Sequence, residues 1–315
     1  MSFERAQWVW HNGSIVPWAD AAVHVSAPSV QYGAGIFEGI RCYEAAQGPA
    51  VFRLKAHLNR FYASAAHYEI QIPYSPTELE DAVRETVQRN GFTSCYIRPI
   101  CYYGNGRPGL LAEECPMNVA ILAWPWGSFL GAGAQAAGIR VTVSKWTKFH
   151  YDMLPTTAKA CGGYLNSMLA AREARHRGYD EALLLDVHGN IAEGPAENVF
   201  MVSQGRLITN DEGSSILLGV TRDSVIQIAR DLGYDVEIRT MPLDELRSAS
   251  EAFFTGTAVE IAPIREVDGS LIGSGGLGPM TAKIQQAFFS AVLGTDKRYF
   301  NWLDSVAAPA TRQGP

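Results

Sequence analysis

The stretch EALLLDVHGNIAEGPAENVFMVSQGRLIT, residues 181–209, shows most clearly which kind of fold this chain adopts. Turn residues at His188-Gly189-Asn190 and at Gln204-Gly205 separate its apolar runs, which predicts two β-hairpins. The segment TRDSVIQIARDLG, shortly after it, repeats apolar residues at helical spacing, with Thr221 as the expected N-cap. Strand hairpins mixed with helices in this way predict an α+β fold rather than a doubly wound parallel sheet.

The first third of the chain shows the same mixture. Asn12-Gly13 stands between two apolar runs, which is the strongest short signal of a hairpin. One helix is expected at about residues 55–68. A second helix should begin at the capping box Ser75-Pro76-Thr77-Glu78 and end at Asn90-Gly91. Two strand-like runs follow, SCYIRPICYYG and MNVAILAWPW.

The length of 315 residues favours two domains over one. The stretch PWGSFLGAGAQ is rich in Gly and Ala and has no clear hydrophobic period, as is typical of a linker. We therefore expect a small N-terminal domain over residues 1–124, a linker over 125–135 and a larger domain over 136–315.

Charge and cysteine content exclude several classes of function. The chain has 26 Lys and Arg against 32 Asp and Glu, a net charge of −6, which argues against a nucleic-acid partner. Neither a membrane-spanning run nor a secretory signal is visible, so we expect a cytoplasmic protein with no membrane partner. The five cysteines form no C-x-x-C pair and the histidines show no metal-ligand spacing, so we expect neither disulfides nor a metal site.

One glycine-rich motif, Gly104-Asn105-Gly106-Arg107-Pro108-Gly109, has the form G-x-G-x-x-G and follows a predicted strand. A dinucleotide site also needs a helix that opens at the end of this motif. Pro116 arrives too soon for a useful helix, so we interpret the motif as a flexible loop over a ligand.

Lys159 is the only charged residue in the run PTTAKACGGY, whose other members are small, apolar or hydroxyl-bearing. One interpretation is an exposed loop lysine, as most lysines are. The other is a desolvated lysine with a lowered pKa, which can form a Schiff base with a planar ligand.

Three further clusters favour the second interpretation. Glu193, in the tight turn EGPAEN, belongs either to an ordinary surface turn or to a buried site where its carboxylate pairs with a pyridinium nitrogen. Residues 218–222 begin a helix, where free N–H groups and the dipole favour a phosphate. The turn at residues 255–258 offers further N–H groups to an anion. A lysine, a carboxylate and a phosphate site are what pyridoxal phosphate requires of a protein.

Seven motifs occur in the order HVSAPSVQYGAGIFEGIRCY, VFRLKAHLNRF, YIRPI, LPTTAKACGGYLNS, IAEGPAENVF, LLGVTRD and FFTGTAVEIAPIREVDG. With them the chain resembles, over roughly residues 6–305, the branched-chain amino acid aminotransferases of the fold-type IV (class IV) pyridoxal-phosphate enzymes. The resemblance implies a small N-terminal α/β domain and a larger cofactor-binding domain with helices and a mixed, barrel-like sheet. It also implies a homodimer or higher homo-oligomer, in which loops of the small domain complete the neighbour's site.

The resemblance also assigns roles to single residues. Lys159 would be the Schiff-base lysine and the proton carrier, Glu193 would keep the pyridinium nitrogen protonated, and Tyr164 would bind the phenolic oxygen of the cofactor. The cofactor phosphate would be bound by Arg60, Leu218, Val220, Thr221 and Thr257. The substrate would be bound by Tyr32, Phe37, Gly39, Tyr96, Arg98, Thr257 and Ala258.

The residues themselves support one part of this assignment. Period-2 alternation in SCYIRPICYY places Tyr96, Arg98, Ile100 and Tyr102 on one face of a strand. Arg98 could form a surface salt bridge there, but its aromatic and aliphatic neighbours favour a pocket. Near the expected substrate entrance the chain departs from its relatives, with Phe129 where they often carry Tyr, with Arg107-Pro108 in the glycine loop, and in the segment WTKFHYDMLP.

The implied activity is branched-chain amino acid transamination of the ping-pong type, as used in biosynthesis. L-leucine, L-isoleucine or L-valine would give its amino group to 2-oxoglutarate, yielding a branched-chain 2-oxo acid and L-glutamate. Alternatives on the same fold are a D-amino-acid transaminase, an (R)-amine transaminase or aminodeoxychorismate lyase, and FEGIR with YIRPI favours the branched-chain type. A catalytically silent pyridoxal-phosphate protein is a further alternative, against which the intact set of Lys159, Tyr164 and Glu193 argues.

Overall fold

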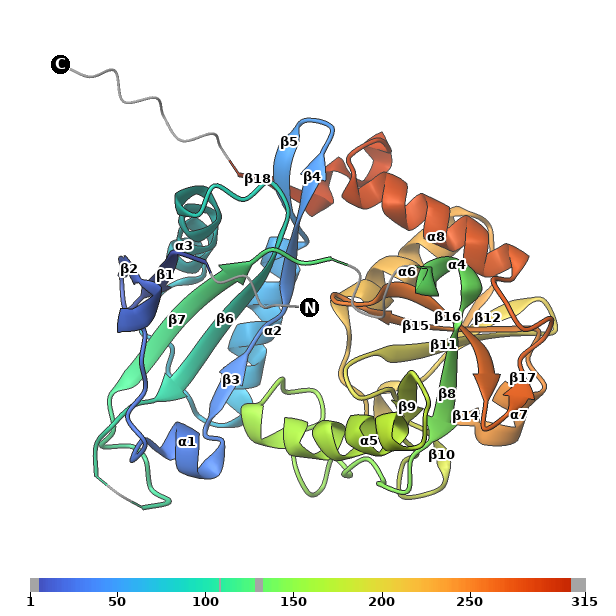
Figure 1. Cartoon of the computed structure of the whole chain (residues 1–315), viewed down its shortest axis with the longest axis horizontal. Helices are drawn as coiled ribbons and strands as arrows, with labels where there is room; N and C mark the ends of the chain where they lie inside the picture. Colours follow the sequence, from blue (N-terminus) through green and yellow to red (C-terminus); the bar gives the residue numbers. More distant parts are fainter. Residues whose placement is uncertain (1–5, 108, 128–132, 307–315) are drawn as a thin grey trace. The chain divides into compact units, whose positions relative to one another are not determined.

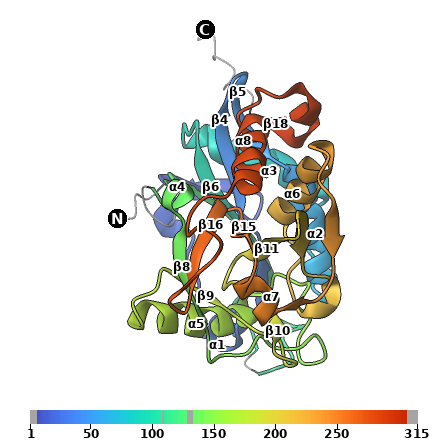
Figure 2. The ribbon, with the colours of Figure 1, turned by 90° about the vertical axis from the view of Figure 1, so that its right-hand side faces the viewer.

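The computed structural model describes residues 6–107, 109–127 and 133–306 (Figures 1 and 2). The chain forms two compact units, one of residues 1–127, 160–162 and 290–315 and the other of residues 128–159 and 163–289. Residues 128–132 of the expected linker lie outside the described part of the chain, and the division into domains at 125–135 stays a prediction.

The first unit is built on an antiparallel sheet. The first hairpin turns at Asn12 and Gly13, whose φ angles are +49° and +89°, so the turn expected from Asn-Gly is confirmed. The strand order is β18 (Leu303–Ser305), β5 (Gly48–Phe52), β4 (Ile40–Ala45), β6 (Cys95–Tyr103), β7 (Met117–Trp124), β1 (Trp8–His11) and β2 (Ser14–Pro17), with β3 (Gly35–Phe37) beside β6.

Helices α2 (Leu54–His67) and α3 (Pro76–Arg89) lie close to their expected ranges. The capping box of α3 is confirmed, because Glu78 N donates to Ser75 Oγ and Ser75 N donates to the Glu78 carboxylate. Apolar side chains of α2 and α3 form one core with the sheet, and α3 lies beside β1 and β7 in Figure 1. The remaining helical segments of this unit are η1 (Trp18–Asp20), α1 (Pro28–Tyr32) and η4 (Lys297–Trp302).

The second unit contains a mixed sheet, in which β12–β13, β16–β8 and β8–β9 pair in parallel and the other strands pair antiparallel. Among the described residues the sheet has two ends, so it does not close into a barrel. The order is β13 (Val236–Ile238), β12 (Arg206–Thr209), β11 (Asn198–Ser203), β15 (Glu251–Gly256), β16 (Glu260–Val267), β8 (Ile139–Val143) and β9 (Glu181–Leu183), with β17 (Ser270–Leu271) beside β16 and a separate pair, β10 (Asn190–Ile191) and β14 (Met241–Pro242).

Helix α5 (Tyr164–His176) runs beside β9 in both ribbon views (Figures 1 and 2). Helix α6 begins at Val220 and its N-cap is Gly219, so the prediction of Thr221 as N-cap was wrong. The reason is tertiary: Asn198 Oδ1 lies 2.1 Å from where a Cβ on Gly219 would be, so only glycine fits at this cap. The other helical segments of the second unit are α4 (Ala134–Ala137), η3 (Glu212–Ser214), α6 (Val220–Asp231), α7 (Leu243–Arg247) and α8 (Pro279–Val292), whose last residues belong to the first unit. The short segment η2 (Cys161–Gly163) has its first two residues in the first unit.

The predicted α+β class is therefore confirmed. None of the helices among the described residues is long and apolar enough to cross a bilayer. The expected hairpin turn at Gln204-Gly205 joins β11 to β12, and both of its residues have positive φ angles.

Candidate active site

Lys159 is buried in the second unit, just before η2, which excludes the exposed loop lysine. Its Nζ donates a hydrogen bond of 2.5 Å to the hydroxyl of Tyr164, the first residue of α5. The ammonium also lies 4.9 Å from the centre of the Tyr164 ring. The lysine and the tyrosine predicted from the sequence are thus in direct contact.

Glu193 is also buried, in the turn that precedes β11, so it does not belong to an ordinary surface turn. Its Oε1 lies 2.6 Å from Nζ of Lys148, and both side chains are less than one-tenth exposed. Its Oε2 accepts hydrogen bonds from the backbone N–H of Leu217 at 3.0 Å and from Nδ2 of Asn198 at 3.3 Å. The carboxylate is therefore held from two sides.

A carboxylate offers about four acceptor positions. Lys148, Leu217 and Asn198 use three of them on Glu193. One further N–H donor can be accepted, which fits the protonated ring nitrogen of a pyridine. The sequence argument missed Lys148, because no local pattern separates it from the exposed Lys145 three residues earlier.

The N-terminus of α6 lies next to this carboxylate. Asn198 connects the two, since its Nδ2 also donates to the Leu217 carbonyl at 2.8 Å and its Oδ1 occupies the space beside Gly219. Gly219 has no side chain to cap the helix, so the first-turn N–H groups of Val220 and Thr221 are left for an external anion. Leu218, just before the cap, is partly exposed.

The turn at residues 255–258 packs against the turn that carries Glu193. Asn198 and Thr255 are paired across β11 and β15. A Cβ on Gly256 would lie 3.2 Å from the Ala196 carbonyl oxygen. Thr257 and Ala258 are half-buried between β15 and β16. The lysine, the carboxylate, the helix terminus and this turn are therefore parts of one structural unit.

Glu197, the second carboxylate of the EGPAEN turn and the competitor of Glu193, is also buried, and so is Glu181, which the sequence argument missed. Burial raises the pKa of Glu197 well above its usual range, and the neighbouring carboxylates of Glu181 and Glu193 raise it further. Lys159 lowers this pKa but compensates only in part. Burial raises the pKa of Glu181 to about 7. Glu197 therefore takes up a proton more readily than a solvent-exposed glutamate.

The first unit brings Tyr96 and Arg98 together on one face of β6, as predicted. Arg98 Nη2 lies 3.3 Å from the Tyr96 hydroxyl. The guanidinium carbon lies over three aromatic rings, at 4.7 Å from Phe37, 5.3 Å from Tyr96 and 5.7 Å from Trp124. Among the described residues Arg98 forms no ion pair, and its contacts are with aromatic rings, which favours the pocket over a surface salt bridge.

Gly39 and two tryptophans complete this aromatic cluster. A Cβ on Gly39 would lie 2.0 Å from the Tyr96 hydroxyl, so glycine is required there. The Tyr96 ring lies 5.1 Å from that of Trp124 and 4.9 Å from that of Trp126. The sequence argument missed both tryptophans, although their spacing in WPW at the end of β7 was a usable signal.

Arg60, on α2, belongs to the first unit, whereas Leu218, Val220, Thr221 and Thr257 belong to the second. Its Nε and Nη2 donate to the two oxygens of Glu38 at 2.7 and 2.9 Å, and His57 Nδ1 lies 2.8 Å from the same carboxylate. Burial raises the pKa of Glu38, but Arg60 and His57 more than compensate and hold it well below its usual range. Glu38 and His57 were not singled out from the sequence.

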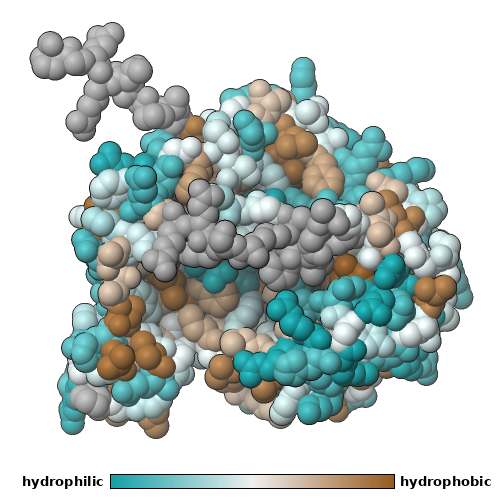
Figure 3. Space-filling view, viewed as in Figure 1, coloured by the Kyte–Doolittle hydropathy of each residue, from teal (hydrophilic) through white to brown (hydrophobic). Residues whose placement is uncertain are grey.

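Other predicted residues lie at the surface of the first unit. Tyr32, at the end of α1, is 50 % exposed and is not among the three rings stacked on the Arg98 guanidinium. Arg107 is exposed and pairs with Glu114 at 3.4 Å, and the residues described between Arg107 and β7 form no helix, as expected. Phe129 lies outside the described residues. Figure 3 shows brown apolar side chains interrupting a mostly hydrophilic face.

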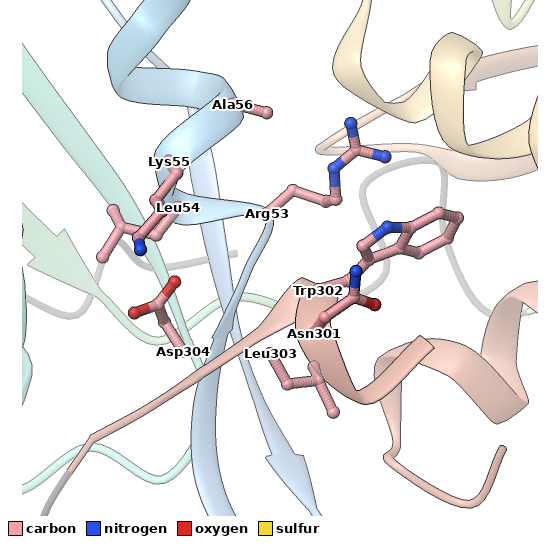
Figure 4. Close-up of a pocket in the computed structure, with 8 residues that line it drawn as sticks. All are labelled: Arg53, Leu54, Lys55, Ala56, Asn301, Trp302, Leu303 and Asp304. Atoms are coloured by element: carbon pink, nitrogen blue, oxygen red, sulfur yellow. The ribbon is translucent and has the colours of Figure 1, made fainter. Parts of the chain in front are cut away.

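A separate cavity of about 270 Å³ lies in the first unit at the start of α2 (Figure 4). Its wall includes Arg53, whose guanidinium lies 4.8 Å from the centre of the Trp302 ring. It contains none of the predicted site residues, and Arg53 is already stacked, so the cavity is not part of the candidate active site. The lining residues are Arg53, Leu54, Lys55, Ala56, Asn301, Trp302, Leu303 and Asp304.

Residues 35–267 match the family model of amino-transferase class IV, and the chain belongs to this family. A curated relative, the branched-chain-amino-acid aminotransferase of Escherichia coli K12, is 43 % identical over 307 residues, covering 97 % of this chain and 99 % of the relative. The crystal structure of the T.th. branched-chain amino acid aminotransferase with pyridoxamine 5′-phosphate is similar, with a TM-score of 0.93, 44 % identity and coverage of 96 % and 99 %. The same T.th. enzyme complexed with N-(5′-phosphopyridoxyl)-L-glutamate gives a TM-score of 0.92 with 43 % identity and coverage of 96 % and 99 %.

Proposed function

We propose that this protein is a branched-chain amino acid transaminase that uses pyridoxal 5′-phosphate. It moves the amino group of L-leucine, L-isoleucine or L-valine to 2-oxoglutarate. The observation that carries the proposal is the buried set in the second unit, where Lys159 meets Tyr164, and Glu193 keeps one acceptor position beside an uncapped helix terminus. The full-length similarity to branched-chain aminotransferases supports this substrate class.

When bound, the cofactor supplies an electron-withdrawing ring that stabilises negative charge at the substrate α-carbon. Lys159 would hold the cofactor covalently in the resting enzyme, and its Nζ would move the proton of the α-carbon only after it is released as a free amine. Tyr164 would orient that amine and bind the phenolic oxygen, while Glu193 would accept the N–H of the ring. In the second unit, the N–H groups of Val220 and Thr221, with Thr257, would bind the phosphate. Arg60 is proposed as a further phosphate ligand.

Substrate selection is assigned to the aromatic cluster of the first unit, together with Tyr32 and with the turn of Thr257 and Ala258. Phe37, Trp124 and Trp126 provide an apolar surface for a leucine side chain. The Arg98 guanidinium can turn to the γ-carboxylate of glutamate, whose burial without a cation is costly. Tyr96 and the N–H groups of the turn hold the α-carboxylate.

The experiment that tests this function compares L-leucine, D-alanine and (R)-1-phenylethylamine as amino donors to 2-oxoglutarate. We expect glutamate to form with L-leucine at a rate at least about tenfold above the other two, since the wrong donor lacks part of its binding energy. A preference for D-alanine or for the amine would favour the corresponding transaminase of the same family. Release of pyruvate from aminodeoxychorismate, with no transamination, would favour the lyase.

We also propose that the protein is cytoplasmic and forms a homodimer or a larger homo-oligomer. Leu165 and Met168 on α5 are 65 % and 57 % exposed, which is unusual for large apolar side chains and supports contact with a second copy. Sedimentation equilibrium checks the mass, and a monomer at micromolar concentration would contradict the assembly.

A further inference from the structure

We propose that Lys148 is a positioning residue of the active site: its ammonium keeps the Glu193 carboxylate charged and oriented, with one acceptor position left for the ring nitrogen of the cofactor. The inference deepens the proposed function and rests on it. Lys148 itself contacts neither substrate nor cofactor in this role, because it acts through Glu193.

Lys148 is fixed in place by its backbone and by its surroundings. Lys148 follows β8, and its backbone N–H donates to the Leu185 carbonyl at 2.8 Å. This hydrogen bond anchors, next to Leu185, the segment that carries Lys148. Its side chain is 8 % exposed, and Nζ lies 4.7 Å from the centre of the Phe149 ring. A lysine is seldom buried without a partner, and here the partner is Glu193 Oε1 at 2.6 Å.

The other oxygen of Glu193 is fixed by a neutral frame. The N–H of Leu217 and Nδ2 of Asn198 both donate to Oε2. Asn198 in turn touches Gly219, the N-cap of α6. The carboxylate is thus oriented by three segments that are distant in sequence, and Lys148 supplies the only cation among these three contacts.

The charges around Glu193 give Lys148 its importance. Glu181, Glu193 and Lys159 all lie close enough to Glu197 to influence its pKa, so Glu193 belongs to a buried cluster of three carboxyl groups. In such a cluster each further negative charge is more costly to bury. Without the Lys148 ammonium, Glu193 would take up a proton, because an unpaired charge is expensive to bury. A neutral acid no longer holds the ring nitrogen protonated.

The test measures the dissociation constant of pyridoxal 5′-phosphate from the apoprotein, by absorbance titration between pH 6 and pH 10, as a ratio to wild type at each pH. For Lys148→Met we expect weaker binding by about tenfold or more at neutral pH. The ratio should return toward one as the pH rises, because Glu193 then loses its proton. Glu193→Gln should weaken binding without this recovery, because glutamine does not titrate. Lys148→Arg should stay close to wild type, since it restores the charge.

Two matched controls separate a positioning role from a structural one. Lys145→Met removes an exposed lysine of the same segment and should leave the ratio at one. The double variant Lys148→Met/Glu193→Gln should bind no more weakly than Glu193→Gln, since both act through one carboxylate. If Lys148→Met does not fold, as judged by circular dichroism of the apoprotein, Lys148→Gln takes its place and should show the same recovery at high pH.

The outcomes distinguish this inference from the proposed function. A loss of affinity that does not depend on pH, or that adds to the loss in Glu193→Gln, would overturn the role of Lys148. Wild-type affinity in Lys148→Met would do the same. If wild-type apoprotein binds no pyridoxal 5′-phosphate, or if borohydride fixes it to a lysine other than Lys159, the proposed function itself fails.

Discussion

Glu193 in the second unit and Arg98 in the first are both charged side chains shielded from solvent, but their interaction partners differ. Glu193 is paired with Lys148 and receives two further hydrogen bonds. Arg98 is stacked among aromatic rings, has no ion-pair partner among the described residues, and its Nε forms no hydrogen bond there. The difference agrees with the proposed roles, in which Glu193 would hold a cofactor that stays bound and Arg98 would bind the carboxylate of a substrate that is exchanged.

The same contrast exists inside the first unit. Arg60 is held by both oxygens of Glu38, which is fully buried. Its guanidinium is therefore fixed in direction, which would suit the phosphate ligand proposed for it. Among the described residues Arg98 has no such carboxylate, which would suit the proposed pocket for both leucine and glutamate.

The largest effect is expected at Lys159, where the second unit performs the chemistry. Lys159→Ala should lower turnover by about a thousandfold or more while the cofactor still binds, because a group that is both nucleophile and proton carrier is lost. Steady-state kinetics with L-leucine measure the change. Lys145→Ala serves as the control with normal turnover, and a comparable loss in that variant would contradict the assignment.

The next effect is on stability and concerns the paired charge of the first unit. Glu38→Gln should lower the free energy of unfolding by about 3 kcal/mol at neutral pH, because Arg60 and His57 lose a buried anion. Denaturant unfolding measures this loss.

The pH dependence of the same variant has a definite sign. Folding lowers the pKa of Glu38. The carboxylate therefore stabilises the folded state at pH values above its unfolded pKa of about 4.3, and this stabilisation is lost as the pH falls below that value. The difference between wild type and Glu38→Gln should therefore shrink in the acid range. A difference that is equal at pH 7 and at pH 3 would show that the carboxylate charge is not what matters.

The next effect is on turnover and concerns Glu193, the paired carboxylate of the second unit, where we expect a smaller loss than at Lys159. Glu193→Gln keeps the shape but removes the charge beside the ring nitrogen, so turnover should fall by about 100-fold with a smaller change in KM. Glu197→Gln is the matched control, because it makes the same substitution at the other buried carboxyl of this turn, whose pKa is raised. Equal losses in the two variants would remove the distinction between the two carboxyl groups.

The smallest and most selective effect is expected at Arg98. Arg98→Leu should raise the KM for 2-oxoglutarate and glutamate by about tenfold or more, with little change for leucine, because only the acidic substrates lose a charged partner. Arg107→Leu tests the exposed glycine loop in parallel. Equal losses for leucine and glutamate in Arg98→Leu would mean that the stacked guanidinium is structural. A selective loss in Arg107→Leu would move the role to the loop.

Much of the first unit could be predicted because its signals are local. The Asn12-Gly13 turn, the Ser75–Glu78 capping box and the shared face of Tyr96 and Arg98 each depend on residues close together in sequence. Backbone sterics and strand alternation act over that range. The start of α6 could not be predicted in the same way, because Asn198, 21 residues before Gly219, decides which residue fits at the cap.

Residue order alone was enough to predict the α+β class, the family, and the lysine, tyrosine and carboxylate on which the proposed chemistry depends. The folded structure was needed to show that Lys148 is buried against Glu193 while Lys145 is exposed, and that Trp124 and Trp126 stand beside Tyr96. The physical reason is that charge burial and ring stacking depend on neighbours brought in from other segments. A lysine is the same residue in both places, and its surroundings decide whether it is a solvated surface charge or the partner of a buried carboxylate.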